Sequence, residues 1–361
     1  QEGRPLALSI DNNLQYLAYR ELSLAVEQHK AKAGAIVMLD ARTGEALALA
    51  NVPSYNPNNR ERLTPAALRN RAITDVYEPG STLKPFTIAA ALETGEYQPE
   101  TLIQTAPGTL TIGPATIHDA HKEGALTVAQ VIQKSSNVGA AKIALTLEPQ
   151  YMWKELHDVG FGSAPKSSFP GEATGRLRPY QIWHPIEQAT MAFGHGISVS
   201  LMQLARAYTV FADDGELKPV SLVKLDRPAV GVQVFSPQTA RAVRRMLEMV
   251  VLPGGTAPRA QVRGYRVAGK TGTAHKLVNG AYAPDLYVAS FVGMAPASNP
   301  RLIVAVMLDQ PGDGQYYGGE VAAPVFSKVM AGALRMLAVP PDAPDSYFVP
   351  PEKLETIKED T

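Results

Sequence analysis

The stretch Glu78-Pro79-Gly80-Ser81-Thr82-Leu83-Lys84-Pro85-Phe86 sets a serine at the start of an apolar segment, with a lysine three positions later. Apolar residues recur as far as Leu92 and stop before Gly95, which predicts a buried helix over 81–92. Positions i and i+3 share a helix face, so Lys84 can serve as the base for a nucleophilic Ser81. The start of a helix also favours a developing negative charge.

The Ser-x-x-Lys spacing alone is a weak signal, because Ser163 with Lys166 and Ser221 with Lys224 share it. The Ser163 pair lies in the Gly-, Pro- and Ser-rich segment 163–179, which predicts a long surface loop. The Ser221 pair alternates like a strand, where i and i+3 point to opposite faces. Without further motifs, an N-cap serine followed by a solvated lysine would explain Ser81 equally well.

A second motif, Ser135-Ser136-Asn137, interrupts the helical stretch 126–147. It offers a hydroxyl and an amide, two groups with different hydrogen-bonding roles. The motif is common by chance, and Ser54-Tyr55-Asn56 matches the same Ser-x-Asn pattern in a turn-rich loop.

A third motif, Lys270-Thr271-Gly272-Thr273, occurs once and lies in the first of three late strand candidates, 266–274, 286–296 and 301–309. Lys270 can place a fixed positive charge, Gly272 lets another backbone approach, and the two threonines share a face that suits a carboxylate. Alone, the tetrapeptide would indicate only a strand with a glycine bulge.

The remaining pattern predicts an α+β fold. A helix over 12–29 capped by Asp11, a hairpin over 35–51, an ordered loop over 53–60, and helices over 199–213, 237–251 and 321–337 account for most of the chain. The short apolar run 6–10 is strand-like. Strands at both ends of the chain indicate one antiparallel sheet, from about 1–51 and 262–338, flanked by helices with an all-helical subdomain over about 64–250. Residues 339–361 are expected to form a Pro-rich tail that frays after a domain of 1–338.

The composition excludes several classes of protein. Lys plus Arg and Asp plus Glu both number 34, so no global charge favours nucleic acid. Cysteine is absent, which excludes disulfides and thiolate metal sites. No apolar run of about 18 residues occurs. The abrupt start suggests a preceding anchor and pedestal domain that this sequence lacks.

The three motifs, in this order, form the signature of penicillin-binding proteins and class A β-lactamases. The resemblance extends to Arg69-Asn70-Arg71-Ala72, Phe169-Pro170-Gly171-Glu172 and Tyr317-Gly318-Gly319, and covers nearly the whole chain. The sequence resembles class B penicillin-binding proteins, particularly the septal, cell-division D,D-transpeptidase of Gram-negative bacteria. The implied fold is that of penicillin-binding transpeptidases and serine β-lactamases.

The resemblance implies that Ser81 attacks the bond between the terminal D-alanines of a stem peptide and that an acceptor amine resolves the acyl-enzyme. It further implies roles for the following residues: Lys84 as base, Ser135 and Asn137 as proton relay and amide holder, Lys270 as orienting charge, the backbone N–H groups of Ser81 and Thr273 as oxyanion hole, and Thr271, Gly272, Thr273, His195, Tyr316 and Tyr317 as binding residues. Lys84 must be neutral to accept a proton, which desolvation and the nearby Lys270 favour.

The resemblance implies no cofactor and no metal. The expected partners are stem peptides, β-lactams, a septal glycosyltransferase and other division proteins. The expected location is the inner membrane, with the catalytic domain in the periplasm.

Three alternatives remain open from sequence. A class A β-lactamase needs a Glu-x-x-Leu-Asn loop, which Glu172-Ala173-Thr174-Gly175 does not match. A D,D-carboxypeptidase would transfer the acyl group to water, and a β-lactam sensor would be acylated without needing a second substrate.

The histidines are a separate question. His118, Asp119 and His121 are interpreted as solvated surface rather than metal ligands. His195 and His275 stand where the family often has Tyr and Arg, so the pocket wall and the carboxylate-binding region depart from the family pattern at these two positions.

Overall fold

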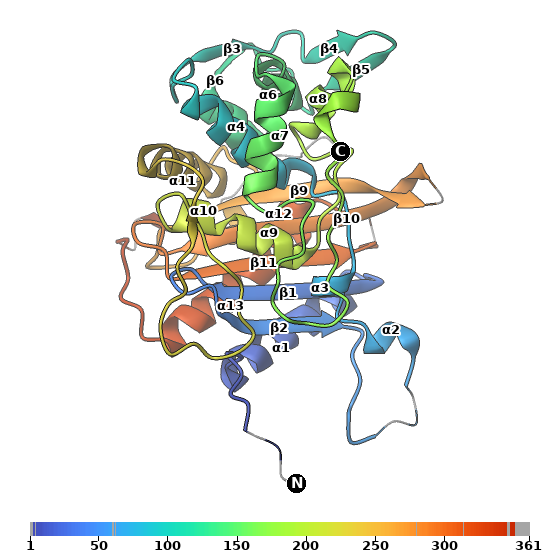
Figure 1. Ribbon diagram of the computed structural model, residues 1–361, viewed down its shortest axis with the longest axis vertical. Helices are drawn as coiled ribbons and strands as arrows, with labels where there is room; N and C mark the ends of the chain where they lie inside the picture. The colour runs from blue at the N-terminus through green and yellow to red at the C-terminus, as the bar shows by residue number, and fades with distance from the viewer. Residues whose placement is uncertain are drawn as a thin grey trace.

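A five-stranded antiparallel sheet forms the centre of the molecule (Figure 1). The computed structural model describes residues 3, 5–59, 61, 63–278, 280–312, 314–344 and 347–350. The strand order is β2-β1-β11-β10-β9, with bounds Ala46–Val52, Ala33–Asp40, Leu302–Asp309, Ala281–Ala295 and Ala268–Val278. Strands from both ends of the chain therefore share one sheet, as the sequence predicts.

Helices cover both faces of this sheet. Successive side chains of a strand point to opposite faces. Phe291 of β10 meets Phe326 of α13 (Ala323–Met336), with ring centroids 4.7 Å apart. α13 also packs against α1 (Asn12–Gln28), which covers β1 and β2 on that side. On the other face lies α9 (Leu201–Ala207), against β1 and β11. β1 is buried along its full length, since it is central and covered on both sides.

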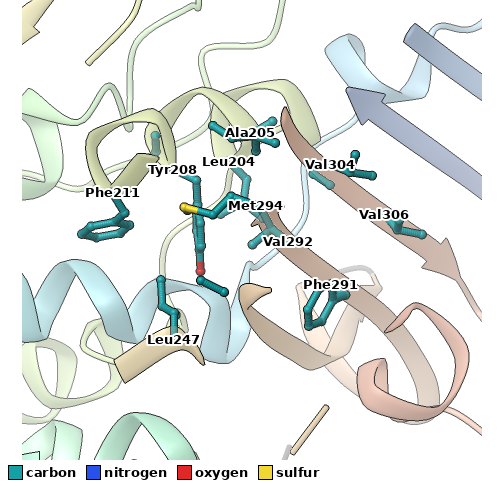
Figure 2. Close-up of a cluster of buried hydrophobic side chains, with 14 of the residues drawn as sticks. Leu204, Ala205, Tyr208, Phe211, Leu247, Phe291, Val292, Met294, Val304 and Val306 are labelled. Carbon is teal, nitrogen blue, oxygen red and sulfur yellow. The ribbon is translucent and has the colours of Figure 1, made fainter. Parts of the chain in front are cut away.

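Figure 2 shows the apolar cluster that joins α9 to the sheet. Leu204 and Ala205 of α9 and the adjacent Tyr208 lie beside Met294 of β10, and all four side chains are fully buried. The Tyr208 hydroxyl donates a hydrogen bond to the carbonyl of Thr82 at 2.8 Å. The core therefore holds the backbone next to Ser81.

The chain between β2 and β9 is mainly helical; part of it stands above the sheet in Figure 1, and part of it, including α9, lies against a face of the sheet. Its helices are α2 (Pro65–Leu68), α3 (Arg71–Thr74), η1 (Gly80–Leu83), α4 (Lys84–Glu93), α5 (Val128–Lys134), α6 (Asn137–Ala144), α7 (Pro149–Asp158), η2 (Tyr180–Ile182), α8 (Pro185–Met191), α9, α10 (Thr209–Ala212), α11 (Pro237–Val251) and η3 (Pro258–Ala260). After β11 follow α12 (Gly318–Val321) and α13. None of the described helices has the length and apolar character needed to cross a bilayer.

This part is not all-helical, which corrects the sequence prediction. It contains three two-stranded sheets: β3 (Leu102–Gln104) with β6 (Ala125–Thr127), β4 (Thr109–Ile112) with β5 (Ala115–His118), and β7 (Glu216–Leu217) with β8 (Val232–Gln233). Thr and Ile residues around the positive-φ Gly113 favour the β4–β5 hairpin. The runs 6–10 and 221–225 form no regular strand. They meet through the isolated bridge of Leu8 with Val223 and through a hydrogen bond from the Ser9 hydroxyl to the Ser221 carbonyl at 3.1 Å.

Other predictions hold with changed bounds. Asp11 caps α1 by accepting from the N–H groups of Asn13 and Leu14, and β1 with β2 form the predicted hairpin. The predicted loop over 53–60 contains no helix or regular strand as far as residue 59, and Arg60 lies outside the described residues. The helix predicted over 321–337 is α13, preceded by the short α12 that ends at Val321, and the helix predicted over 199–213 is α9 followed by α10.

The tail does not fray along its whole length. The Asp342 carboxylate accepts hydrogen bonds from the backbone N–H of Arg266 at 2.7 Å and the Ser298 hydroxyl at 2.6 Å. The Tyr265 hydroxyl donates to the carbonyl of Val339 at 2.6 Å. These contacts tie the start of the tail to the sheet domain. Residues 351–361 lie outside the described residues.

Candidate active site

Ser81 lies in a 3₁₀ turn rather than in the first turn of an α-helix. The turn η1 covers Gly80–Leu83, and α4 begins at Lys84 with Pro85 as its second residue. Gly80 has φ +56°, a backbone conformation suited to glycine, which lets the chain enter this tight turn. In 3₁₀ geometry, side chains at i and i+3 eclipse one another. The side chains of Ser81 and Lys84 therefore point in more nearly the same direction than they would in an α-helix.

The Lys84 side-chain nitrogen contacts three oxygen atoms. Nζ lies 2.8 Å from Ser81 Oγ, 3.0 Å from Ser135 Oγ and 2.6 Å from the Ser135 carbonyl. The Lys84 side chain is fully buried, so these contacts stand in for the water it has lost. The predicted pair of Ser81 and Lys84 is in direct contact.

Ser135 reaches this position through a left-handed turn between α5 and α6. It is the C-cap of α5, with φ 61° and ψ 37°. The Asp119 carboxylate, just after β5, holds the next helix in place. It accepts from the Ser136 hydroxyl at 2.7 Å and from the Val138 N–H at 2.9 Å. Asp119 therefore anchors the start of α6, a role its sequence neighbourhood does not reveal.

Lys270 approaches Ser135 from the opposite side. Its Nζ lies 2.9 Å from Ser135 Oγ and 3.0 Å from Thr271 Oγ1, and its side chain is fully buried. The Ser135 hydroxyl thus lies between two lysines. The atoms Ser81 Oγ, Lys84 Nζ, Ser135 Oγ and Lys270 Nζ form one continuous line of contacts that joins the helical part to β9.

Gly272 allows the Ser81 turn to lie directly on β9. A Cβ at residue 272 would stand only 2.7 Å from the Pro79 carbonyl oxygen. One at residue 80 would stand 3.1 Å from the Thr273 carbonyl oxygen. This is the close backbone approach that Gly272 indicates in the sequence.

Both threonine hydroxyls of the motif are hydrogen-bonded. Thr271 Oγ1 lies 2.8 Å from Thr256 Oγ1 as well as near Lys270, and Thr273 Oγ1 accepts from the Gly318 N–H at 3.0 Å. A substrate carboxylate must therefore exchange with, or add to, these bonds. Asn137 is buried beside Ser135 and donates from Nδ2 to the His118 carbonyl at 3.2 Å.

His195 follows α8 and forms one side of the site. Its ring lies 5.2 Å from that of Phe193 and 6.0 Å from that of Tyr282. Burial, reinforced by the positive charge of Lys84 and by His275, lowers the pKa of His195 to about 4. The imidazole is therefore neutral at neutral pH.

Glu78 and Tyr282 join His195 through contacts that the sequence does not predict. The Tyr282 hydroxyl, near the tip of the β9–β10 hairpin, donates to both Glu78 oxygens, at 2.9 and 3.1 Å. Glu78 also accepts from the Gly196 N–H at 2.9 Å. Burial raises the pKa of Glu78, and the hydrogen bonds from Gly196 and Tyr282 oppose the rise.

Aromatic rings continue from His275 to the predicted tyrosines. The His275 ring lies 4.6 Å from Tyr287, which stacks on Tyr316 at 4.0 Å. The hydroxyls of Tyr316 and Tyr317 are 3.2 Å apart. The His275 ring therefore packs on an aromatic neighbour, and Tyr287 links it to the pair Tyr316 and Tyr317.

Glu172 is held by its own loop. Its carboxylate accepts from the N–H groups of Lys166 and Ser167, at 2.9 and 2.7 Å, and from the Ser167 hydroxyl. These contacts give the carboxylate a structural use in the 163–179 loop. Over the described residues, no three His, Cys, Asp or Glu side chains gather as a metal site.

A serine in direct contact with a buried lysine is an arrangement that serine acyltransferases use to activate a nucleophile. Residues 34–331 match the family model of the penicillin binding protein transpeptidase domain. The chain belongs to this family, and its enzyme class is that of the peptidoglycan D,D-transpeptidases.

The relatives and solved structures agree with this assignment. The chain is 50% identical over 344 residues to the probable peptidoglycan D,D-transpeptidase PenA of Neisseria flavescens, covering 95% of this chain and 86% of the relative. It is 43% identical over 343 residues to the peptidoglycan D,D-transpeptidase FtsI of Escherichia coli K12, covering 95% of this chain but only 58% of that protein.

The transpeptidase domain of penicillin-binding protein 3 from Burkholderia pseudomallei superposes with a TM-score of 0.87 at 51% identity, covering 95% of this chain and all of that one (100%). A Burkholderia ambifaria structure titled peptidoglycan glycosyltransferase gives a TM-score of 0.85 at 52% identity, with 94% and 100% covered. The predicted fold is confirmed.

Proposed function

We propose that this domain cross-links peptidoglycan stem peptides through an acyl-enzyme on Ser81. The observation that carries the proposal is the unbroken contact line from Ser81 Oγ through Lys84 Nζ and Ser135 Oγ to Lys270 Nζ, at 2.8, 3.0 and 2.9 Å. A nucleophile, a base and a relay in direct contact are the parts that acyl transfer needs.

Acylation begins when Lys84 takes the Ser81 proton. Ser81 Oγ then forms a bond to the carbonyl carbon between the two terminal D-alanines of the stem peptide. The carbon–nitrogen bond breaks, and D-alanine leaves with a proton relayed from Lys84 through Ser135. Lys270 attracts the terminal carboxylate, which binds at the hydroxyls of Thr271 and Thr273.

The backbone N–H groups of Ser81 and Thr273 form the oxyanion hole in this proposal. Donors held in place stabilise charge that appears only in the transition state. The contact of Gly80 with Thr273 supports this role, because it fixes the two backbone segments against each other. Asn137 holds the peptide amide, while His195, Tyr316 and Tyr317 flank the acyl group.

Deacylation by an amine completes the cross-link. The amine of a second stem peptide attacks the ester carbon, the bond to Ser81 Oγ breaks, and the amine proton returns to Ser81 through Lys84. β-Lactams mimic the D-alanyl-D-alanine end and leave Ser81 acylated. The engagement of Glu172 within its own loop favours transfer to an amine over rapid hydrolysis.

We place this reaction in cell division, in a protein anchored in the inner membrane with the domain in the periplasm. The septal glycosyltransferase and other division proteins are the proposed partners. The similarity to a transpeptidase named FtsI supports this placement.

Intact-mass measurement after incubation with a fluorescent penicillin tests the nucleophile. We expect one stable adduct on the wild-type chain and none on Ser81→Ala. Ser163→Ala is the matched control, because Ser163 has the same Ser-x-x-Lys spacing, and it should be labelled like the wild type. Labelling of Ser81→Ala would refute the proposed nucleophile.

A second assay separates transfer from its alternatives. A D-alanyl-D-alanine donor is supplied with and without an amine acceptor, and products are resolved by mass. A cross-linked product supports transpeptidation. Hydrolysis alone would indicate a carboxypeptidase, and a stable adduct with neither product would indicate a sensor.

A further inference from the structure

Thr256 is a buried threonine outside the three sequence motifs, and its hydroxyl lies against β9. The residue is only 1% exposed, and its Oγ1 lies 2.8 Å from Thr271 Oγ1. Among the residues that the structure describes, Thr271 is the only hydrogen-bonding partner of this hydroxyl. The proposed reaction gives Thr256 no role.

The surrounding backbone holds Thr256 in this place. The residue lies in the turn after α11, where the Ala257 N–H donates to the Val250 carbonyl at 2.9 Å. A Cβ at Gly255 would collide with that carbonyl, and one at Gly319 of α12 would collide with the Thr256 carbonyl. The two glycines therefore let the turn pack closely between α11 and α12.

The number of hydrogens determines the direction of the bond between the two threonines. A hydroxyl has one hydrogen to donate and two lone pairs that accept. If Thr271 donated to Thr256, the Thr256 hydrogen would be buried without an acceptor among the described residues. A buried donor without an acceptor is strongly disfavoured. Thr256 therefore donates, and Thr271 Oγ1 accepts.

The Thr271 hydroxyl also accepts from Lys270, whose Nζ lies 3.0 Å from Thr271 Oγ1. A lysine that carries the positive charge of the proposed function has no lone pair, so it can only donate. Both lone pairs of Thr271 Oγ1 are then occupied. Its hydrogen is thereby directed away from both donors, toward the acceptor that the proposed function supplies, which is the terminal carboxylate of the substrate.

We infer that Thr256 is a positioning residue for carboxylate recognition. Its hydroxyl donates to Thr271 and so directs the Thr271 hydrogen to the carboxylate of a stem peptide or a β-lactam. The bound carboxylate adds a hydrogen bond to this network and replaces none. The inference rests on the proposed function, which binds the carboxylate at Thr271.

The test compares penicillin with its methyl ester, which lacks the charge of the carboxylate. Second-order rate constants for acylation of Ser81 are measured for both compounds by intact mass, and their ratio reports carboxylate recognition. Thr256→Val replaces the hydroxyl by a methyl group of similar size. We expect it to lower the ratio of acid to ester about threefold to tenfold, the range of one hydrogen bond. A merely structural role would slow both compounds alike.

Thr256→Ser and Thr256→Cys differ by one atom and give the same comparison if Thr256→Val does not fold. The serine variant keeps the donor and should keep the ratio, whereas the cysteine variant has a weak donor and should lower it. Thr105→Val is the matched control, because Thr105 is buried just after β3 and its hydroxyl donates to the Gly124 carbonyl at 2.8 Å. It lies outside the proposed site and should keep the wild-type ratio.

Thr271→Val shows whether Thr256 acts through Thr271. In that background, Thr256→Val should not change the ratio further, because the hydroxyl that Thr256 orients is already gone. An unchanged ratio in Thr256→Val, or a further loss in the double variant, would overturn the inference. Failure of the proposed function appears differently, as missing labelling of Ser81 by either compound in the otherwise wild-type chain.

Discussion

At the scale of single residues, Lys84 makes the contacts on which the proposed chemistry depends, because it touches both Ser81 and Ser135. Replacement by methionine keeps the length of the side chain and removes the base. General-base catalysis contributes about 10²–10⁴-fold, so we expect Lys84→Met to slow acylation by about that factor. Stopped-flow labelling with fluorescent penicillin measures the rate. Lys166→Met, at the equivalent position of the 163–166 pair, should label at the wild-type rate, and an unchanged rate for Lys84→Met would contradict the assignment.

His195 makes the stability of the domain depend on pH. Its pKa is lowered to about 4 in the folded state, against an ordinary value of 6.5. As pH falls below 6.5, the unfolded chain binds a proton first, so stability is present above 6.5 and is lost as pH falls toward 4. We expect His195→Gln to lose less stability than the wild type between pH 7 and 4.5, by on the order of 1–2 kcal/mol.

Urea unfolding at several pH values measures this difference. Parallel curves of unfolding free energy against pH for His195→Gln and the wild type would show that the imidazole is not held neutral.

The sequence predicted Ser81, Lys84, Ser135 and Lys270 as candidates because each lies in a short motif with a recognisable spacing. The structure brings these four side chains into contact. The sequence could not predict the hydrogen bond of Tyr282 to Glu78, because it joins residues 204 positions apart and has no local pattern. Asp119 is a similar case, because its acceptor role depends on the turn at Ser135 that folds back toward it.

At the scale of elements, two glycines near His195 differ in the space around them. A Cβ at Gly194 would stand 2.2 Å from the Gly80 carbonyl oxygen, whereas one at Gly196 would meet no atom within 4 Å. Both have positive φ, +87° and +79°. We expect Gly196→Ala to cost about 1 kcal/mol from backbone strain, and Gly194→Ala to cost clearly more and to slow penicillin acylation.

Thermal unfolding and labelling rates compare the two variants. Equal behaviour would mean that the contact between Gly194 and the Ser81 turn has no effect on the position of that turn.

The start of α6 depends on Asp119 as an acceptor. Asp119→Ala leaves the Ser136 hydroxyl and the Val138 N–H without their partner. We expect a loss of about 1–3 kcal/mol and slower acylation, since Ser135 and Asn137 flank this turn. Urea unfolding and penicillin labelling measure both effects. Lys142→Ala, on the same helix, should change the acylation rate little, and an Asp119→Ala rate equal to the wild type would exclude a positioning role.

The elements themselves were predicted with uneven success, for physical reasons. The hairpin of β1 and β2 consists of two apolar-rich runs joined by a short polar turn that ends in Gly44, and it was found with bounds close to those observed. The first part of β10 was missed because Pro284 and Asp285 are unfavourable in strands. The 3₁₀ turn at Ser81 was interpreted as α-helix because its apolar pattern is continuous with that of α4.

At the scale of the whole molecule, the proposed site joins the sheet to the helical part, since Lys270 is on β9 and Ser135 lies between α5 and α6. Acylation of Ser81 adds contacts to both parts, so we expect one thermal transition, raised by a few degrees in the acylated protein. Differential scanning calorimetry with and without penicillin tests this. Two transitions, only one of which shifts, would show that the parts unfold separately.

The order of strands in the sheet has a consequence for how the protein is made. Ala33 of β1 pairs with Asp309 of β11, so the central ladder joins segments synthesised roughly 270 residues apart. At about 5–20 residues per second, β1 waits for tens of seconds before its partner emerges from the ribosome. Pairings this distant in sequence also fold slowly. Until β11 arrives, one hydrogen-bonding edge of β1 lacks its native partner, and an open strand edge can pair with another chain.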